Sequence, residues 1–272
     1  MEKRGRGNHI NGGIALLPYY ILTAAFGLIV GSFLNVCIHR LPQKGLSIVT
    51  PPSSCPACGK RIKPWHNIPV ISYLALRGRC AYCGVHISLR YPAVELLNGI
   101  LYVLVYAKFG ITAYSIYYMM FISALIVITF IDIDYQIIPD VITLPGMMLG
   151  LVGSIFILPE PHLYGRLMGI SGSLAGLFTG GLIFYLIAVV SRGGMGGGDI
   201  KLMAMAGATF GWKSILLTIF IGSFAGSIYG ISLMIFKGKG RKAKIPFGPF
   251  LSLGAAVSLF YGREIIAYYL NL

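Results

Sequence analysis

The sequence has few charged residues. Asp, Glu, Lys and Arg make up 11% of its 272 residues, which is less than half the roughly 25% of an ordinary soluble domain. Acids are the scarcest, with 8 Asp and Glu against 22 Lys and Arg. Apolar residues make up 56%, and several apolar runs approach or exceed the ~18 residues of a membrane-spanning helix. This shortage of charge argues against a soluble globular protein and predicts a polytopic membrane protein.

The net charge of +14 does not indicate a nucleic-acid-binding protein. Basic residues collect in the cytoplasmic loops of membrane proteins, and here most of them fall on one side of the predicted spans, together with a polar insert at 38–92. No cleavable signal peptide is evident, because the apolar segment 14–36 is long enough to span and lacks a small-residue cleavage site. We therefore expect a multi-pass protein with a cytoplasmic insert and an external N-terminus.

We expect an all-α membrane protein with about eight transmembrane helices and a small cytoplasmic zinc-ribbon-like insert. The expected parts are a tail (1–13), a first transmembrane helix (14–37), a four-cysteine domain (38–92) and a transmembrane domain (93–272). The expected spans are 14–36, 93–107, 114–134, 141–158, 167–190, 200–210, 214–236 and 247–262. The segment 200–210 covers only ~16 Å against a ~30 Å hydrocarbon core. Because a helix break at membrane depth needs protein or water around it, this segment indicates a site.

The insert contains two Cys-x2-Cys pairs, Cys55 with Cys58 and Cys80 with Cys83, each followed by a glycine. This spacing is typical of a zinc-ribbon-like site with four thiolate ligands. Two disulfides are the alternative, which a reducing cytoplasm disfavours. Four thiolates fill the tetrahedral shell, so the metal would be structural. An insert with few large apolar side chains also needs such a staple to fold.

The acidic residues near the ends of spans are functional candidates, because an ionisable side chain at membrane depth is costly. Asp132 and Asp134 end an apolar run. Two residues along a helix turn the side chain by ~200°, so only one of them can face a common partner. Asp132 lies deeper in the run and is predicted to be the buried one. For Asp140, which follows Pro139, we favour a helix-capping role.

Asp199 follows a run with five glycines in six positions, 193–198, and opens the short segment 200–210. A cap would explain the aspartate alone, but the glycines are more than a cap needs and let the backbone approach another helix. Two carboxyl groups in one site hold a single proton between them. The ionised one would take a proton from an attacking water, and the protonated one would stabilise the oxyanion. Asp132 and Asp199 therefore predict an intramembrane aspartyl protease.

Four motifs carry a family resemblance that covers nearly the whole chain. They are GSFLNVCIHRLP at 31–42, SLRYPAVELL at 88–97 after the paired cysteines, FIDIDYQIIPD at 130–140 and GGGDIKLMAMAGATFGW at 196–212. Together they resemble the type IV prepilin peptidase family, the bifunctional prepilin leader peptidases and N-methyltransferases, which are aspartyl proteases of the Gly-x-Gly-Asp type. Any one of these motifs alone would be weak, whereas the set of four is specific.

The resemblance implies that Asp132 and Asp199 are the catalytic residues. It implies cleavage of a short basic leader after a glycine, at the cytoplasmic face of the bacterial inner membrane, with prepilins or pseudopilins of type IV pili, type II secretion or DNA-uptake systems as substrates. S-adenosylmethionine would then methylate the new N-terminus, and the cysteine insert favours this bifunctional form. No S-adenosylmethionine motif is readable, and Gly78, Arg79 and Glu95 are the candidates for its binding. Membrane lipid is the other expected partner.

Two other functions stay open on the residues alone. Glycine-broken helices with acids at the break also occur in proton-coupled transporters, and a zinc-dependent membrane scaffold would need no catalysis. The acids here lie toward the cytoplasmic ends of the predicted spans rather than at the midplane, and no inverted repeat is visible. These features favour the protease.

Overall fold

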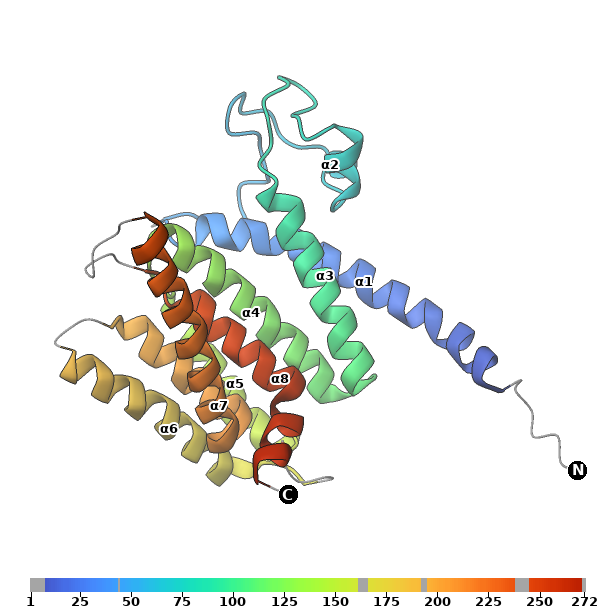
Figure 1. Cartoon of the computed structure of the whole chain (residues 1–272). Coiled ribbons are helices and arrows are strands. Elements are labelled where there is room, and N and C mark those ends of the chain that lie inside the picture. Colours follow the sequence, from blue (N-terminus) through green and yellow to red (C-terminus); the bar gives the residue numbers. More distant parts are fainter. Residues whose placement is uncertain (1–7, 44, 161–165, 192–194, 238–244, 271–272) are drawn as a thin grey trace, which may run out of the picture. The chain divides into compact units, whose positions relative to one another are not determined.

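A computed structural model describes residues 8–43, 45–160, 166–191, 195–237 and 245–270, with the side chains of 8–15 and 270 left aside. The long helices, labelled in Figure 1, are α1 (Asn8–Arg40), α3 (Arg90–Phe109), α4 (Ala113–Tyr135), α5 (Asp140–Phe156), α6 (Gly169–Val190), α7 (Gly197–Lys237) and α8 (Gly248–Leu270). The insert holds the short 3-10 helix η1 (Pro64–His66) and α2 (Ile71–Ala75). Isolated bridges are the only β structure within the described ranges. The all-α prediction is confirmed.

Six helices of the described chain are long and apolar enough to cross a membrane, namely α1, α3, α4, α6, α7 and α8, and α5 is a shorter apolar helix. The protein is therefore a multi-pass membrane protein. The predicted segments 200–210 and 214–236 form one element, α7, with a break at Gly211 (φ 76°, ψ 174°). Parts of two predicted segments lie outside the described residues: the first seven residues of the tail, and Gly193 and Gly194 of the glycine run. Residues 238–244, between the expected spans 214–236 and 247–262, also lie outside them.

The chain divides into two compact units. The first contains residues 1–40 and 45–123, and the second contains 41–44 and 124–272. The first unit therefore includes α3 and the start of α4 along with α1 and the insert. The predicted division of the sequence at residue 93 stays a prediction.

In the first unit, α1 and α3 pack through small residues. A Cβ at Gly27 would lie 2.8 Å from the Cα of Gly99, and one at Gly31 would lie 2.7 Å from the Cα of Glu95. The Asn98 side chain donates a 2.7 Å hydrogen bond to the Gly27 carbonyl and is completely buried. Small residues and interhelical polar bonds are the usual means of helix association in membranes. They place Glu95 against α1.

In the second unit, α6 and α7 lie side by side. Gly176 of α6 and Gly207 of α7 face each other so closely that a Cβ on either would overlap the partner's carbonyl oxygen. The Ser173 hydroxyl donates a 2.6 Å hydrogen bond to the Ala208 carbonyl. All residues from 202 to 211 are buried, so the segment predicted to be too short to span is enclosed by protein beyond its first two residues. This enclosure fixes the half of α7 that begins next to Asp199.

Candidate active site

Asp132 lies in the last turn of α4, where its side chain is buried, whereas Asp134 is exposed. This is the burial difference that the helical period predicted. The Oδ2 atom of Asp132 accepts a 2.8 Å hydrogen bond from the backbone N–H of Gly248, the first residue of α8. A Cβ at position 248 would lie 2.8 Å from that same oxygen. Glycine is therefore the residue that lets the start of α8 hold this carboxyl group.

Asp199 lies in the first turn of α7 and is also buried. Its Oδ2 accepts a 3.3 Å hydrogen bond from the backbone N–H of Gly196, and its own N–H donates to the Gly196 carbonyl at 3.1 Å. A third-position acid that reaches back to the N–H before the helix is half of a capping box. Asp199 therefore caps its helix, and it also lies within electrostatic range of Asp132.

The glycine before Asp199 has a packing reason. A Cβ at Gly198 would lie 2.7 Å from the Cβ of Ile138, a buried residue of the segment between α4 and α5. The expectation that glycines allow close backbone approach is met at this position. The start of α7 therefore packs directly against the segment that follows Asp132.

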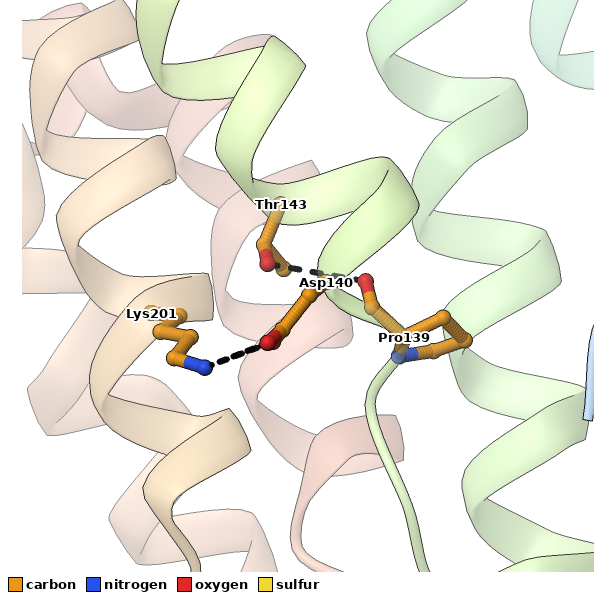
Figure 2. Close-up of polar contacts among 4 residues, drawn as sticks. All are labelled: Pro139, Asp140, Thr143 and Lys201. Carbon is orange, nitrogen blue, oxygen red and sulfur yellow. Dashed lines mark hydrogen bonds and ion pairs between the residues drawn. The ribbon is translucent and has the colours of Figure 1, made fainter.

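Lys201 and Asp140 form an ion pair across the second unit. The Lys201 Nζ lies 2.7 Å from both carboxylate oxygens of Asp140, as Figure 2 shows. Lys201 is two residues after Asp199, and Asp140 is the first residue of α5. The pair joins the segments that follow the two buried aspartates.

The capping role that we favoured for Asp140 is wrong. Helix α5 begins at Asp140 with Pro139 in the N-cap position, and no side chain caps it. The Thr143 hydroxyl donates to the Pro139 carbonyl (Figure 2). Pro139 is extended (φ −69°, ψ 130°), so the helix starts one residue earlier than a cap at 140 requires. The Asp140 carboxylate is thereby free to meet Lys201.

The four insert cysteines converge on one point. The sulfur atoms of Cys55, Cys58, Cys80 and Cys83 all lie within 4.8 Å of one another, and none of these cysteines forms a disulfide. The Cys55 and Cys83 sulfurs are 3.8 Å apart, the edge length of a tetrahedron with metal–sulfur bonds of ~2.3 Å. The geometry therefore fits a single metal ion rather than the alternative of two disulfides.

The two cysteine pairs have the same local geometry. Gly59 donates its N–H to the Cys55 carbonyl and Gly84 donates to the Cys80 carbonyl, at 2.9 and 3.0 Å. Both glycines have positive φ, 69° and 70°, which explains why a glycine follows each pair. Backbone N–H groups of Tyr82 and Cys83 lower the pKa of the Cys80 thiol to about 6, whereas desolvation and the neighbouring thiols raise the pKa of Cys83 to about 11. A thiolate is the form that binds metal.

Of the three residues considered for cofactor binding, two form part of a turn. Gly78 has φ 68° and its carbonyl accepts the Ile87 N–H at 2.7 Å. Arg79 forms an isolated bridge with His86 just before the second cysteine pair. Glu95 is different, because it is buried on α3.

The comparisons with known proteins agree over most of the chain. Residues 25–109 match the family described as Bacterial Peptidase A24 N-terminal domain, and residues 119–231 match the one described as Type IV leader peptidase family. A protein of Pseudomonas aeruginosa named prepilin leader peptidase/N-methyltransferase is 36% identical over 94% of each chain. One of Legionella pneumophila with the same name is 34% identical over 96% of this chain and 99% of its own. No solved structure matches.

The chain belongs to the type IV leader peptidase family. It is therefore an enzyme rather than a transporter or a scaffold. The matched ranges include both buried aspartates and the four cysteines of the insert. Two contacts of the candidate site were missed by the sequence reasoning: the Gly248 N–H that binds Asp132, and the Lys201 amine that binds Asp140. A glycine directly before Pro249 marks a helix start, but nothing local to 247–250 indicates that an aspartate lies opposite.

Proposed function

We propose that this protein cleaves the basic leader from prepilins or pseudopilins by means of Asp132 and Asp199, and that it N-methylates the new N-terminal residue. The observation that supports the proposed cleavage is the pair of buried carboxyl groups in the second unit, which lie within electrostatic range of each other. Each is held by the backbone N–H of a glycine, Gly248 or Gly196. The names of the relatives support both activities.

The two carboxyl groups would share one proton. The ionised aspartate takes a proton from a water molecule, and the oxygen of that water attacks the scissile carbonyl carbon. The protonated aspartate donates a hydrogen bond to the oxyanion that forms. It then protonates the leaving nitrogen as the peptide bond breaks. Both side chains are oriented by backbone groups rather than by mobile side chains, which favours precise placement of the attacking water.

The cysteine tetrad would hold a structural zinc ion. Its four thiolates fill the tetrahedral shell and leave no position for water or substrate. The metal would fold the insert, which contains only the short elements η1 and α2, and would take no part in peptide cleavage. S-adenosylmethionine would supply the methyl group.

We further propose that the insert and the aspartates face the cytoplasm, in a bacterial inner membrane. Residues 38–92 contain several Lys and Arg and no Asp or Glu, which agrees with the positive-inside rule. These basic side chains would contact anionic lipid headgroups.

Replacing either aspartate tests the cleavage mechanism. Asp132→Asn and Asp199→Asn, each incubated in detergent with a full-length prepilin, should lower the cleavage rate by at least about 10³-fold, because each loss removes one half of the acid–base pair. Asp134→Asn is the matched control, since it changes an exposed aspartate on the same helix. Full cleavage by either Asp132→Asn or Asp199→Asn would disprove the two-aspartate mechanism.

A further inference from the structure

Glu95 lies far from every other acidic residue in the sequence. It is the only acidic residue from position 3 to position 131, a stretch with many Lys and Arg. Its side chain is buried, with 8% of the residue exposed. A buried carboxyl group is costly unless several donors meet it. The peptide-cleaving pair lies in the other unit and makes no use of it.

The donors that meet Glu95 come from two other elements. Its Oε2 accepts a 2.8 Å hydrogen bond from the backbone N–H of Val70, and the Ser32 hydroxyl of α1 also donates to it. Val70 precedes α2 and has φ 61° and ψ −48°. A β-branched residue at positive φ is a strained outlier, and such strain persists where the surroundings impose it and clusters at functional sites. The hydrogen bond from its N–H joins this strained residue to Glu95.

A cavity of about 650 Å³ lies beside these contacts, between α1 and the insert. Its lining includes Ser32 and Pro69, which are respectively a donor to Glu95 and the neighbour of Val70. Most of the other lining residues are apolar, among them Ile29 and Phe33. The one basic lining residue is Arg40, whose guanidinium donates to the Ser47 and Pro51 carbonyls. Small-molecule sites have this composition, apolar walls with a few polar groups, and volumes of roughly 300 to 1,000 Å³.

The ligand that this arrangement fits carries a positive charge on nitrogen. A carboxylate accepts hydrogen bonds and attracts cations, and the apolar walls suit the end of an apolar peptide. Leader cleavage creates a new α-amino group on such a peptide. We propose that Glu95 binds this amino group and takes its proton before N-methylation, an inference that rests on the proposed function.

The step balances with a sulfonium methyl donor. The Glu95 carboxylate removes one proton from the ammonium group, which leaves a lone pair on nitrogen. The nitrogen attacks the methyl carbon, the carbon–sulfur bond breaks and its electron pair stays on sulfur. A second proton leaves the methylated nitrogen for solvent when the product is the neutral amine. Glu95 returns its proton to water before the next turnover.

A purely structural role for Glu95 makes a different prediction. If Glu95 only anchors the insert through Val70, then Glu95→Gln retains an oxygen acceptor for that N–H and should methylate normally. If Glu95 serves the amino group, Glu95→Gln loses the charge and the base. The methylated fraction of the cleaved product should then fall about 100-fold, the lower end of what a general base contributes. A wild-type methylated fraction in Glu95→Gln would overturn the proposal. Glu160→Gln is the control carboxylate.

A binding measurement separates this inference from the cleavage mechanism. In the Asp199→Asn background, a peptide with the mature N-terminal sequence and a free amino group should bind about tenfold more tightly than its N-acetylated form. Glu95→Gln should abolish that preference and Glu160→Gln should retain it. No preference in the parent protein, or a preference that survives Glu95→Gln, would overturn the role of Glu95. Neither result would test the two-aspartate mechanism. That mechanism would be disproved only by cleavage that persists in Asp132→Asn or Asp199→Asn.

Discussion

The two compact units arrange their buried carboxyl groups in opposite ways. In the second unit, Asp132 and Asp199 each accept a hydrogen bond from a backbone N–H at the start of a helix. The helices around them pack so closely at glycines that their backbones are in contact. In the first unit, Glu95 is held by Val70, a residue of an insert in which four cysteines meet at one point. One site therefore depends on helix packing, and the other depends on an insert whose four cysteines are placed to bind a metal ion. Perturbations that act on packing or on metal should affect the two activities differently.

The largest effect should come from losing the metal. Structural zinc contributes roughly 10 to 16 kcal/mol of apparent binding free energy to small domains, so Cys55→Ser or prolonged chelation should unfold the insert. N-methylation should fall to background, while cleavage should stay within about tenfold of wild type because both aspartates lie in the second unit. Metal content by mass spectrometry, limited proteolysis of residues 45–92 and both activities should be measured together.

Cys37→Ser is the control for this experiment, because Cys37 is a buried cysteine of α1 outside the tetrad. Equal loss of cleavage and methylation in Cys55→Ser, with Cys37→Ser unaffected, would contradict the separation of the two sites.

A smaller but sharper effect should follow from one methyl group at position 248. The side chain of Gly248→Ala would lie 2.8 Å from the Asp132 Oδ2 atom, so the carboxyl group must move. A displacement of ~1 Å in a catalytic group can cost about 10²-fold, and kcat for cleavage should fall by that amount. Methylation of a peptide that already lacks its leader should be unchanged.

Gly262→Ala tests whether this effect is local. Gly262 lies on the same helix, but a Cβ there would be 3.7 Å from its nearest neighbour, an ordinary contact. It should cleave at the wild-type rate. Equal activity of Gly248→Ala and Gly262→Ala would contradict the placement of Asp132 by the start of α8.

The smallest effect should come from the Asp140–Lys201 ion pair. The side chains are 54% and 40% exposed, and exposed pairs contribute only about 0.2 to 1 kcal/mol. Asp140→Asn and Lys201→Gln should each slow cleavage by about two- to fivefold, since a shift of the α7 start also shifts Asp199. The double variant Asp140→Lys with Lys201→Asp should recover part of that loss.

Lys213→Gln removes a lysine from the same helix without touching the pair and should cleave normally. A charge-swapped double variant slower than both single variants would show that the pair does not act through its mutual attraction.

Local patterns in the sequence predicted much of the fold and part of the site. The helical period predicted that only one of Asp132 and Asp134 would be buried, and the deeper position of Asp132 in the apolar run identified it as that one. The spacing of the cysteine pairs, each with its glycine, was enough to predict the tetrad. Apolar runs gave the helices, and the break near Gly211 was expected, although the segments on either side of it form one element.

What the sequence did not predict depends on contacts between distant segments. The N–H that binds Asp132 lies 116 residues away, and the Lys201 amine lies 61 residues from Asp140. A backbone N–H has no signature in the sequence, since every residue other than proline has one. Asp140 was interpreted as a cap because capping is a local property, whereas its actual partner is supplied by tertiary packing.

Because of the break at Gly211, the direction in which side chains point in one half of α7 does not determine their direction in the other half. Each residue added to or removed from a continuous helix turns everything beyond it by ~100°. At Gly211 the backbone leaves the helical conformation, so the first half can be fixed by α6 while the second half is fixed by the contact of Gly254 in α8 with the Thr218 backbone. A one-residue deletion between Asp199 and Gly211 would therefore turn Asp199 away from Asp132, while the second half of α7 would keep its face toward α8. A change of length in one half therefore does not rotate the other half. Only a change in the first half would move Asp199.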